Sequence, residues 1–302
     1  MKFLIIGAGI GKHHAKNLKE LGHGVEIFDI DPSLRTVDST EGSYDGFLIC
    51  TPPDSHLQYI EGAIDRGVHI FVEKPISDKV TPELERVVWI AREKGLVFQV
   101  GYNLRFSSLK DVKRLIDENT IGRMLCLRAE FGQWLPDWRP HRNYLDTYTA
   151  QCGVLLDAAS HEIDYIRWIL GKEPDYVSCC AGNYSDLNTP GEDMAEIMLE
   201  FDNMLMASIH VDYIQKGYTR KLKIIGTEGQ IEWTYPKEIT VVKKGHTDVT
   251  LVEYDSYKDE MVHFIKCIED KSLLMDAVYA VKVLKIVETA KLSAKEHRRI
   301  KL

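Results

Sequence analysis

A glycine loop near the start of the chain is the first feature that points to chemistry. Gly7, Gly9 and Gly11, with Ile10 between the last two, follow directly on the apolar run Phe3–Ile6 and precede a segment of helical periodicity. Glycines let the backbone turn tightly and approach a pyrophosphate, and a helix N-terminus behind them offers N–H groups and partial positive charge. The pattern indicates a dinucleotide-binding loop, one residue shorter than GxGxxG; a purely structural glycine turn is the alternative.

An acidic residue further along distinguishes between the two common dinucleotides. Asp29 follows Gly7 by 22 residues and comes directly after the second apolar run. A carboxylate at this place accepts a hydrogen bond from the ribose 2′-hydroxyl of NAD and repels the 2′-phosphate of NADP. NAD is therefore the expected cofactor and NADP the less favoured one, although Arg35 nearby weakens the preference.

The segments around this loop predict alternating strands and helices. Buried strands are indicated by apolar runs bounded by Gly, Asp or Pro, at Phe3–Ile6, Val25–Phe28, Phe47–Cys50, His69–Val72 and Val97–Val100. Helical periodicity lies between most of them, at 11–21, 54–66 and 81–94. The alternation predicts an α/β, doubly wound parallel sheet of the Rossmann type. Only residues 29–46 join the second strand to the third, so a helix there would be short or absent.

The pattern changes after about residue 120. A helical segment at 158–170 is followed by runs with strand character, joined by short turns, at 176–184, 194–201, 204–213, 220–225 and 229–234. The tail, about 257–296, is again helical. We therefore predict an NAD-binding domain at 1–120. A C-terminal α+β substrate-binding and oligomerisation domain follows at 121–302, with a large open, mostly antiparallel sheet and the C-terminal helices.

The composition excludes several classes of protein. The 302 residues carry 46 acidic against 38 basic side chains, a net charge of −8, which argues against nucleic-acid and anionic-membrane partners. No apolar run approaches the ~18 residues of a spanning helix, and the short run before the glycine loop does not suit a signal peptide. The six scattered cysteines form no CxxC pair, so we expect reduced thiols, a cytoplasmic protein and no bound metal.

Further motifs follow predicted strands, at the sheet edge where doubly wound folds bind ligands. They are Cys50-Thr51-Pro52-Pro53 with His56 after it, Glu73-Lys74-Pro75, and Gly101-Tyr102-Asn103-Leu104-Arg105-Phe106. Later, Asp157, His161 and Asp164 form a D-x-x-x-H-x-x-D pattern. Together these motifs resemble the Gfo/Idh/MocA family, the glucose–fructose oxidoreductase and inositol dehydrogenase group, over nearly the whole chain.

The resemblance implies a Rossmann domain followed by a domain built on a large open sheet. Members of the family mostly oxidise or reduce a sugar or cyclitol carbon with NAD(P), so a dehydrogenase acting on CH–OH groups is expected. The catalytic lysine, aspartate and histidine of the family map onto Lys74, Asp157 and His161. The residues expected to contact the coenzyme are Gly7, Gly9, Ile10, Gly11, Asp29, Thr51, Pro52, His56, Glu73 and Lys74.

These residue types suit alcohol oxidation. Lys74 would hold the reacting oxygen and stabilise a developing alkoxide, and His161, with an ordinary pKa of ~6.5, would carry the proton. Asp157, four residues earlier, would orient the imidazole or bind a substrate hydroxyl. The alternatives are a surface lysine before a turn, a structural helix histidine, and an aspartate that caps the 158–170 helix. Asp164 is expected to be structural or to support the residues that contact the ligand.

The segment 133–144 is rich in Trp, Arg and Tyr. Aromatic faces stack on sugars, and arginine binds carboxylate or phosphate with two hydrogen bonds, which favours a nucleotide-linked or acidic sugar. The alternative is a loop that packs against another subunit. The residues expected to contact the substrate are Asn103, Arg105, Trp138, Arg139 and Tyr144.

The predicted function is hydride transfer between nicotinamide and a hydroxyl or keto carbon of a sugar-like small molecule. One alternative is a glycosidase that retains NAD and uses transient oxidation, and another is a non-catalytic NAD- and sugar-binding sensor. Reduction of an imine or a tetrapyrrole is a more distant alternative. An open sheet would leave one apolar face exposed in a monomer, so we expect a homodimer or homotetramer formed through the C-terminal sheet.

Overall fold

The computed structural model describes residues 1–138, 140–141, 143–202, 204–272 and 276–302. They form two compact units, Met1–Asn103 with Asp255–Leu284, and Leu104–Tyr254 with Lys285–Leu302. This division differs from the predicted domains 1–120 and 121–302. The reason is that Met261 and Phe264 of α8 (Ser256–Glu269) pack into the apolar core of the first unit.

The first unit is built on a five-stranded parallel sheet with strand order β2-β1-β3-β4-β5. Its strands are β1 (Lys2–Ile6), β2 (Gly24–Phe28), β3 (Gly46–Ile49), β4 (His69–Glu73) and β5 (Phe98–Gly101). Its first three helices are α1 (Gly11–Glu20), α2 (His56–Arg66) and α3 (Pro82–Glu93). The strand order reverses at β1, so the carboxyl ends of β1 and β3 form the switch point at which such sheets bind ligands. The predicted strands and helices of this half are confirmed.

Local sequence explains these elements. β3 is buried at every position, and α3 begins at Thr81, whose hydroxyl accepts the Leu84 N–H at 3.1 Å ahead of Pro82. The link between β2 and β3 contains neither helix nor strand, as expected. It returns to β2 through Thr36, whose N–H donates to the Ile27 carbonyl at 2.8 Å.

The second unit contains a nine-stranded sheet with strand order β13-β12-β11-β10-β6-β9-β8-β7-β14. Its strands are β6 (Met124–Trp134), β7 (Tyr176–Gly182), β8 (Met194–Phe201), β9 (Leu205–Asp212), β10 (Ile214–Gly226), β11 (Gly229–Thr234), β12 (Glu238–Lys243), β13 (His246–Leu251) and β14 (Ile300–Lys301). Neighbouring strands are antiparallel except β6 and β9, which are parallel. The predicted fold class is therefore confirmed, although no strand was predicted over 238–243 or 246–251.

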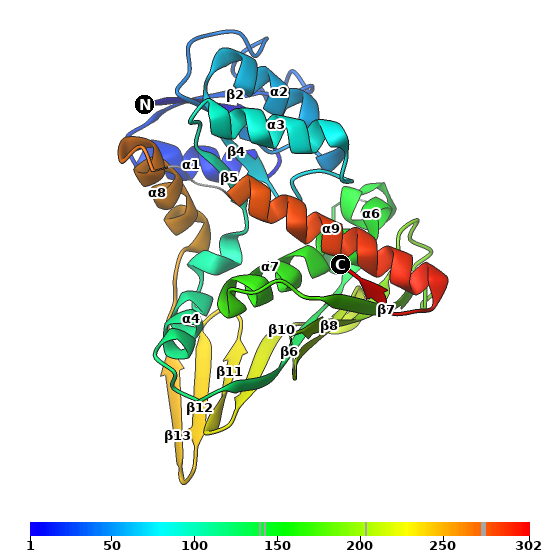
Figure 1. Cartoon of the computed structure of the whole chain (residues 1–302). Coiled ribbons are helices and arrows are strands. Elements are labelled where there is room, and N and C mark those ends of the chain that lie inside the picture. The colour runs from blue at the N-terminus through cyan, green and yellow to red at the C-terminus, as the bar shows by residue number, and fades with distance from the viewer. Residues whose placement is uncertain (139, 142, 203, 273–275) are drawn as a thin grey trace. The chain divides into compact units, whose positions relative to one another are not determined.

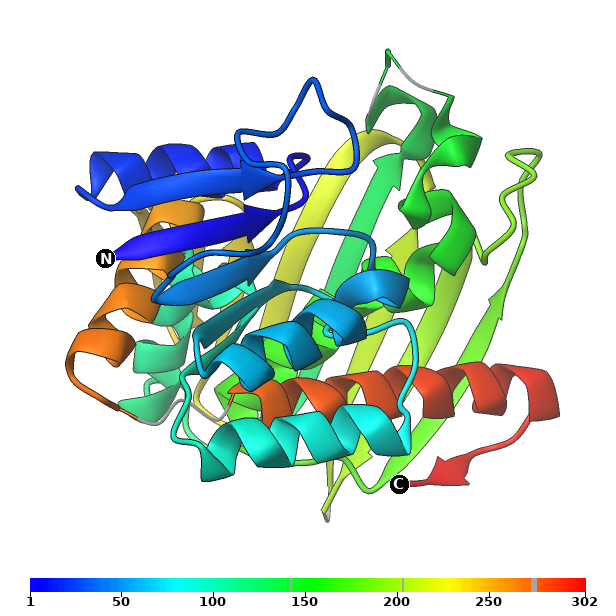
Figure 2. The same cartoon turned by 90° about the horizontal axis from the view of Figure 1, so that it is seen from above.

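Helices cover one face of this large sheet, whose long strands run side by side (Figure 1, Figure 2). The helices of this unit are α4 (Leu109–Asp117), α5 (Leu135–Trp138), α6 (Tyr148–Asp157) and α7 (Ala159–Leu170), while α9 (Asp276–Glu296) contributes to both units. Along β9, Ala207, Ile209 and Val211 are buried beneath α7, whereas Ser208 and His210 point to the opposite, open face.

The open face is not uniformly apolar. The strand register aligns Lys221, Glu130, His210 and Glu196 in a row across β10, β6, β9 and β8. This finding corrects the premise of an exposed apolar face, because charged groups of alternating sign occupy the middle of the sheet. In the described ranges, no helix is long and apolar enough to cross a bilayer.

Candidate active site

The glycine loop joins the ends of two strands in the first unit. Gly7 has φ +96°, and a Cβ there would lie 2.6 Å from the Cys50 carbonyl oxygen, so only glycine fits. A Cβ on Gly11 would lie 2.6 Å from the Ile5 side chain, which explains the close packing of α1 on β1. At Gly9, by contrast, an added Cβ would meet no described atom within 4 Å, so the loop has open space at its middle glycine.

The first turn of α1 adds backbone donors to this loop. Its N-cap residue, Ile10, contributes no side-chain hydrogen bond to the turn. Helix N–H groups without an internal partner and with a partial positive charge suit a phosphate. The loop, its helix and the open side of Gly9 therefore fit a pyrophosphate.

Asp29 is attached to the same loop. One carboxylate oxygen accepts the Ala8 N–H at 2.6 Å and the other accepts the Asp31 N–H at 2.9 Å. A carboxylate has further acceptor sites and can still receive a ribose hydroxyl. Arg35 pairs with the exposed Asp38 at 2.9 Å, so its guanidinium charge is partly balanced there.

His56 connects two loops instead of lining a cleft. The side chain is fully buried; Nε2 lies 2.8 Å from the Thr51 carbonyl oxygen and Nδ1 lies 3.1 Å from that of Pro75. Burial lowers the pKa of His56, against the opposing effect of these carbonyls. His56 therefore links the loop after β3 to the loop after β4, while Thr51 and Pro52 keep surface from which to contact a ligand.

Glu73, at the end of β4, is likewise held by a buried histidine. Its Oε1 lies 2.7 Å from Nε2 of His14, a fully buried residue of α1, and only 13% of the Glu73 side chain is exposed. A Cβ on Gly101 would lie 3.2 Å from Glu73 Oε2, so the next strand also confines the carboxylate. Glu73 thus fixes the end of β4 just before Lys74, which is half-buried. His14 was not among the predicted site residues.

Asp157 and His161 lie where two helices meet in the second unit. Gly153, with φ +78° and ψ 170°, breaks α6, and the next N–H, that of Val154, donates to the Glu192 carbonyl at 2.9 Å. Asp157 is the last residue of α6, and α7 follows after Ala158. Both Asp157 and His161 are 8% exposed.

The carboxylate of Asp157 is held at both oxygens. Tyr148 donates its hydroxyl to Oδ1 at 2.8 Å, and Tyr213 donates to Oδ2 at 2.9 Å. The N-cap position of α7 belongs to Ala158, with no side-chain cap. Asp157 therefore does not cap α7, contrary to the alternative interpretation. Neither tyrosine was predicted, because both lie outside the Asp157/His161 motif.

The predicted substrate contacts have different surroundings. Asn103 is buried and donates to the Ser256 hydroxyl at 3.3 Å, and Tyr144 donates to the Leu187 carbonyl at 2.9 Å. Arg105 forms two hydrogen bonds with Asp164, whose side chain is 1% exposed. Trp138, at the end of α5, is 39% exposed. Arg139 lies outside the described residues.

The candidate residues thus form two groups. Gly7, Gly9, Asp29 and Lys74 belong to the first unit, at the carboxyl ends of parallel strands. Asp157 and His161 belong to the second unit, together with the Arg105–Asp164 pair. Within the described ranges, His, Cys, Asp and Glu side chains form no group of three that could hold a metal ion.

Comparisons with known proteins match segments of both units. An oxidoreductase family with an NAD-binding Rossmann fold matches residues 32–102, and the Gfo/Idh/MocA C-terminal domain matches residues 109–232. Myo-inositol 2-dehydrogenase from Thermotoga maritima is 25% identical over 338 residues, covering 100% of this chain and 98% of that protein.

Two solved structures share the fold. Levoglucosan dehydrogenase, in complex with NADH and levoglucosan, is 19% identical with a TM-score of 0.87, covering 100% of this chain and 99% of that one. UDP-N-acetylglucosamine 3-dehydrogenase from Acidithiobacillus ferrooxidans is 19% identical with a TM-score of 0.84, covering 98% of each chain. Family matches on both units, a full-length dehydrogenase relative and the glycine loop lead to one conclusion: the chain belongs to the Gfo/Idh/MocA family and is an NAD-binding oxidoreductase.

Proposed function

We propose that this protein is an NAD-dependent dehydrogenase that transfers hydride between nicotinamide and a carbinol or keto carbon of a sugar derivative. The observation that carries the proposal is the carboxylate of Asp157, fastened at both oxygens by Tyr148 and Tyr213, four residues before His161. The two phenol donors fix the orientation of this carboxylate, as a group that orients a proton carrier requires.

The chemistry divides among three side chains. NAD, when bound, supplies the nicotinamide carbon that takes up the carbinol hydrogen with its electron pair. His161 takes the hydroxyl proton, because imidazole exchanges protons near neutral pH. The Lys74 ammonium stabilises the negative charge that develops on the oxygen, and Asp157 orients the imidazole.

The dinucleotide preference follows from Asp29. Its carboxylate is held beside the glycine loop by the Ala8 N–H at 2.6 Å, so a 2′-phosphate would meet a fixed negative charge. Calorimetric titration of the coenzyme-stripped protein should show NAD bound at least about tenfold more tightly than NADP. Absence of binding by either dinucleotide would overturn the proposal and make the sensor hypothesis the first choice.

Turnover tests the catalytic assignment. NADH formation should be measured with myo-inositol, levoglucosan and UDP-N-acetylglucosamine, the substrates in the names of the relatives. Lys74→Ala should lower kcat by roughly 10²–10⁴, a much larger effect than its effect on NAD affinity. Lys79→Ala, an exposed lysine of the same loop, is the matched control. Comparable kcat values in both variants would contradict the role of Lys74, and tightly retained NAD without NADH formation would favour the glycosidase.

Within this function we favour a nucleotide-linked or acidic sugar. Trp138 is 39% exposed at the end of α5, and indole rings stack on the apolar faces of sugars. Arg105 supports this choice less than its sequence position suggested, because Asp164 already engages its guanidinium. Trp138→Ala should raise the substrate KM without changing NAD affinity.

Assembly and location remain predictions of the same kind. We infer a homodimer or homotetramer that pairs through the open face of the nine-stranded sheet, with the alternating charges there facing opposite charges on the second copy. Light scattering after gel filtration measures the assembly directly. All six cysteines are free thiols, which supports a cytoplasmic protein.

A further inference from the structure

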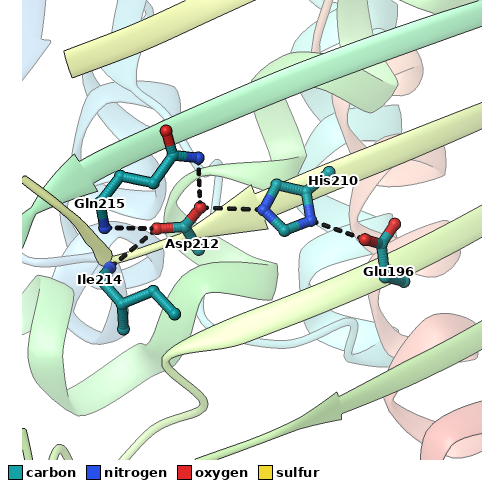
Figure 3. A network of polar contacts seen from close by, with 5 residues as sticks. All are labelled: Glu196, His210, Asp212, Ile214 and Gln215. Carbon is teal, nitrogen blue, oxygen red and sulfur yellow. Dashed lines mark hydrogen bonds and ion pairs between the residues drawn. The ribbon is translucent and has the colours of Figure 1, made fainter. Parts of the chain in front are cut away.

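A histidine on the open face of the large sheet lies between two carboxylates. Nδ1 of His210 on β9 lies 2.7 Å from Glu196 Oε1 on β8, and Nε2 lies 2.9 Å from Asp212 Oδ2 (Figure 3). The hydrogen bond to Asp212, reinforced by Glu196, raises the pKa of His210 to about 9 against the effect of burial. The ring is therefore a cation with both N–H groups engaged at neutral pH.

Charges on the neighbouring strands complete this environment. Glu130 of β6 lies opposite His210 in the strand register, on the other side from Glu196. Arg128 and Lys221 line the same depression of about 400 Å³ on the open face. His210 is thus accessible from the open face while its two ring nitrogens remain bound to protein carboxylates.

Asp212 is the buried partner of this network. Its carboxylate is 1% exposed and accepts the N–H groups of Ile214 and Gln215 at 2.8 and 2.9 Å. The Gln215 side-chain amide adds a contact of 2.6 Å (Figure 3). Burial alone would raise the pKa of Asp212, but the hydrogen bonds from His210, Gln215 and the backbone lower it. The ionised carboxylate therefore fixes the corner at which β9 ends and β10 begins.

Tyr213 is the residue at that corner. Its N–H donates to the Asp193 carbonyl at 2.9 Å, and its carbonyl accepts the Leu135 N–H at 3.1 Å, so the backbone is held on both sides. Its side chain is fully buried, and its hydroxyl donates to Asp157 at 2.9 Å. Asp212 and Tyr213 are consecutive residues. The backbone at this corner therefore connects the carboxylate of Asp212 to the carboxylate of Asp157 in the candidate active site, through the Tyr213 hydroxyl.

We propose that Tyr213 is a positioning residue for Asp157 and that the His210–Asp212 pair on the open face fixes Tyr213 in this role. The inference rests on the proposed function, in which Asp157 orients the proton carrier. The open face would then have a second role besides contact with a partner subunit. Its polar network of His210 and Asp212 would determine how firmly the Asp157 carboxylate is held.

The experiment uses the full chain and two isosteric or near-isosteric changes. Tyr213→Phe removes the hydroxyl, and His210→Gln removes the charge on the open face. The matched controls are Tyr165→Phe and His246→Gln. The Tyr165 hydroxyl is fully buried with no hydrogen-bond partner in the described part of the chain, and His246 is an exposed histidine beside Asp248.

Kinetics are measured with whichever of myo-inositol, levoglucosan and UDP-N-acetylglucosamine the wild type oxidises fastest. Tyr213→Phe should lower kcat about tenfold or more with the KM for NAD unchanged, since it removes a hydrogen bond to a charged group. The acidic limb of its pH–rate profile should move to higher pH. His210→Gln should lower kcat about threefold in the wild type and not at all in Tyr213→Phe, because both changes act through one hydroxyl. Both controls should stay within about twofold.

Two kinetic results would overturn the inference: equal kcat for Tyr213→Phe and Tyr165→Phe, or an effect of His210→Gln that persists in the Tyr213→Phe background. If the wild type oxidises none of the substrates, the proposed function fails separately. In that case the positioning role is tested by NMR alone. The protein is labelled with carbon-13 aspartate, and the carboxyl-carbon signal of Asp157 is assigned as the one that Asp157→Asn removes. It should shift in Tyr213→Phe and His210→Gln, and an unchanged signal in both would refute the positioning role.

Discussion

In the first unit, backbone groups fix the candidate coenzyme site: Gly7 lies against the Cys50 carbonyl, and Asp29 accepts the Ala8 N–H. In the second unit, side chains fix the candidate proton-transfer site, since Tyr148 and Tyr213 donate to Asp157. A backbone site depends on a few glycines close in sequence. A side-chain site depends on residues brought together from distant strands and helices. Its geometry is therefore more sensitive to single substitutions elsewhere in the chain.

The largest effect should come from the Arg105–Asp164 pair, a second contact between side chains in the second unit. Arg105→Met leaves the nearly inaccessible Asp164 carboxylate without its cation and should lower the free energy of unfolding by about 3–5 kcal/mol. Arg86→Met breaks the exposed pair with Glu61 and should cost at most about 1 kcal/mol. Urea unfolding measures both. An Arg105→Met variant of normal stability with a raised substrate KM would restore the prediction that Arg105 contacts the substrate.

The glycine loop should give the next largest effect. Gly7→Ala places a Cβ 2.6 Å from the Cys50 carbonyl oxygen at φ +96°, and should lower the free energy of unfolding by about 2–4 kcal/mol and abolish NAD binding. Gly9→Ala meets open space and should cost about 1 kcal/mol or less, while still weakening NAD binding by crowding the pyrophosphate. Equal stability of the two variants in urea would show that the backbone contact at Gly7 is unimportant.

A smaller effect is expected at Asp29. Asp29→Asn keeps an acceptor for the Ala8 N–H but removes the charge, so the ratio of NADP to NAD affinity should rise about tenfold with little change in stability. Glu41→Gln, which removes an exposed carboxylate paired with Arg66, provides the control. Calorimetry with each dinucleotide measures the ratio, and a ratio unchanged by Asp29→Asn would contradict the carboxylate's role in selection.

The smallest effect concerns pH. The pKa of His210 is raised from 6.5 to about 9, so its stabilising effect is complete below pH 6.5 and is lost as pH rises through about 9. Because the side chain is partly exposed, solvent screening should reduce the loss to about 1 kcal/mol. The difference in unfolding free energy between wild type and His210→Gln should therefore shrink between pH 6.5 and 9.5. A difference independent of pH in this window would show that His210 is not held as a cation.

Most of the first unit could be predicted from sequence because its signals are local. Buried strands appear as apolar runs, and the positive φ of Gly7 is a local backbone conformation that favours glycine. The side-chain contacts of His56 and Glu73 could not be predicted, because their partners, Pro75 and His14, are fixed only when the parallel strands align. Both were predicted to contact the coenzyme, and the structure shows that their side chains also hold the loops of this unit.

The second unit was less predictable for the same physical reason. Every residue of β13 is exposed, so this strand lacks the alternation of buried and exposed positions that predicts a strand. Arg105 and Asp164 are far apart in sequence, and a pattern of residue types cannot show that an arginine is already engaged. The Asp157/His161 motif was visible, but the donors that hold it come from residues 148 and 213.

The order of strands in the large sheet has a consequence for how the chain folds. β9 and β10 follow each other directly, yet β6 lies between them, parallel to β9 and antiparallel to β10. The β7–β8–β9 and β10–β13 meanders can each form from connections between consecutive strands, whereas β6 must first close a loop of many residues at an entropic cost. We therefore expect β6 to be the last strand to enter. The corner at Tyr213 then acquires its geometry only when the central strand is in place, which makes assembly of the candidate active site one of the final events of folding.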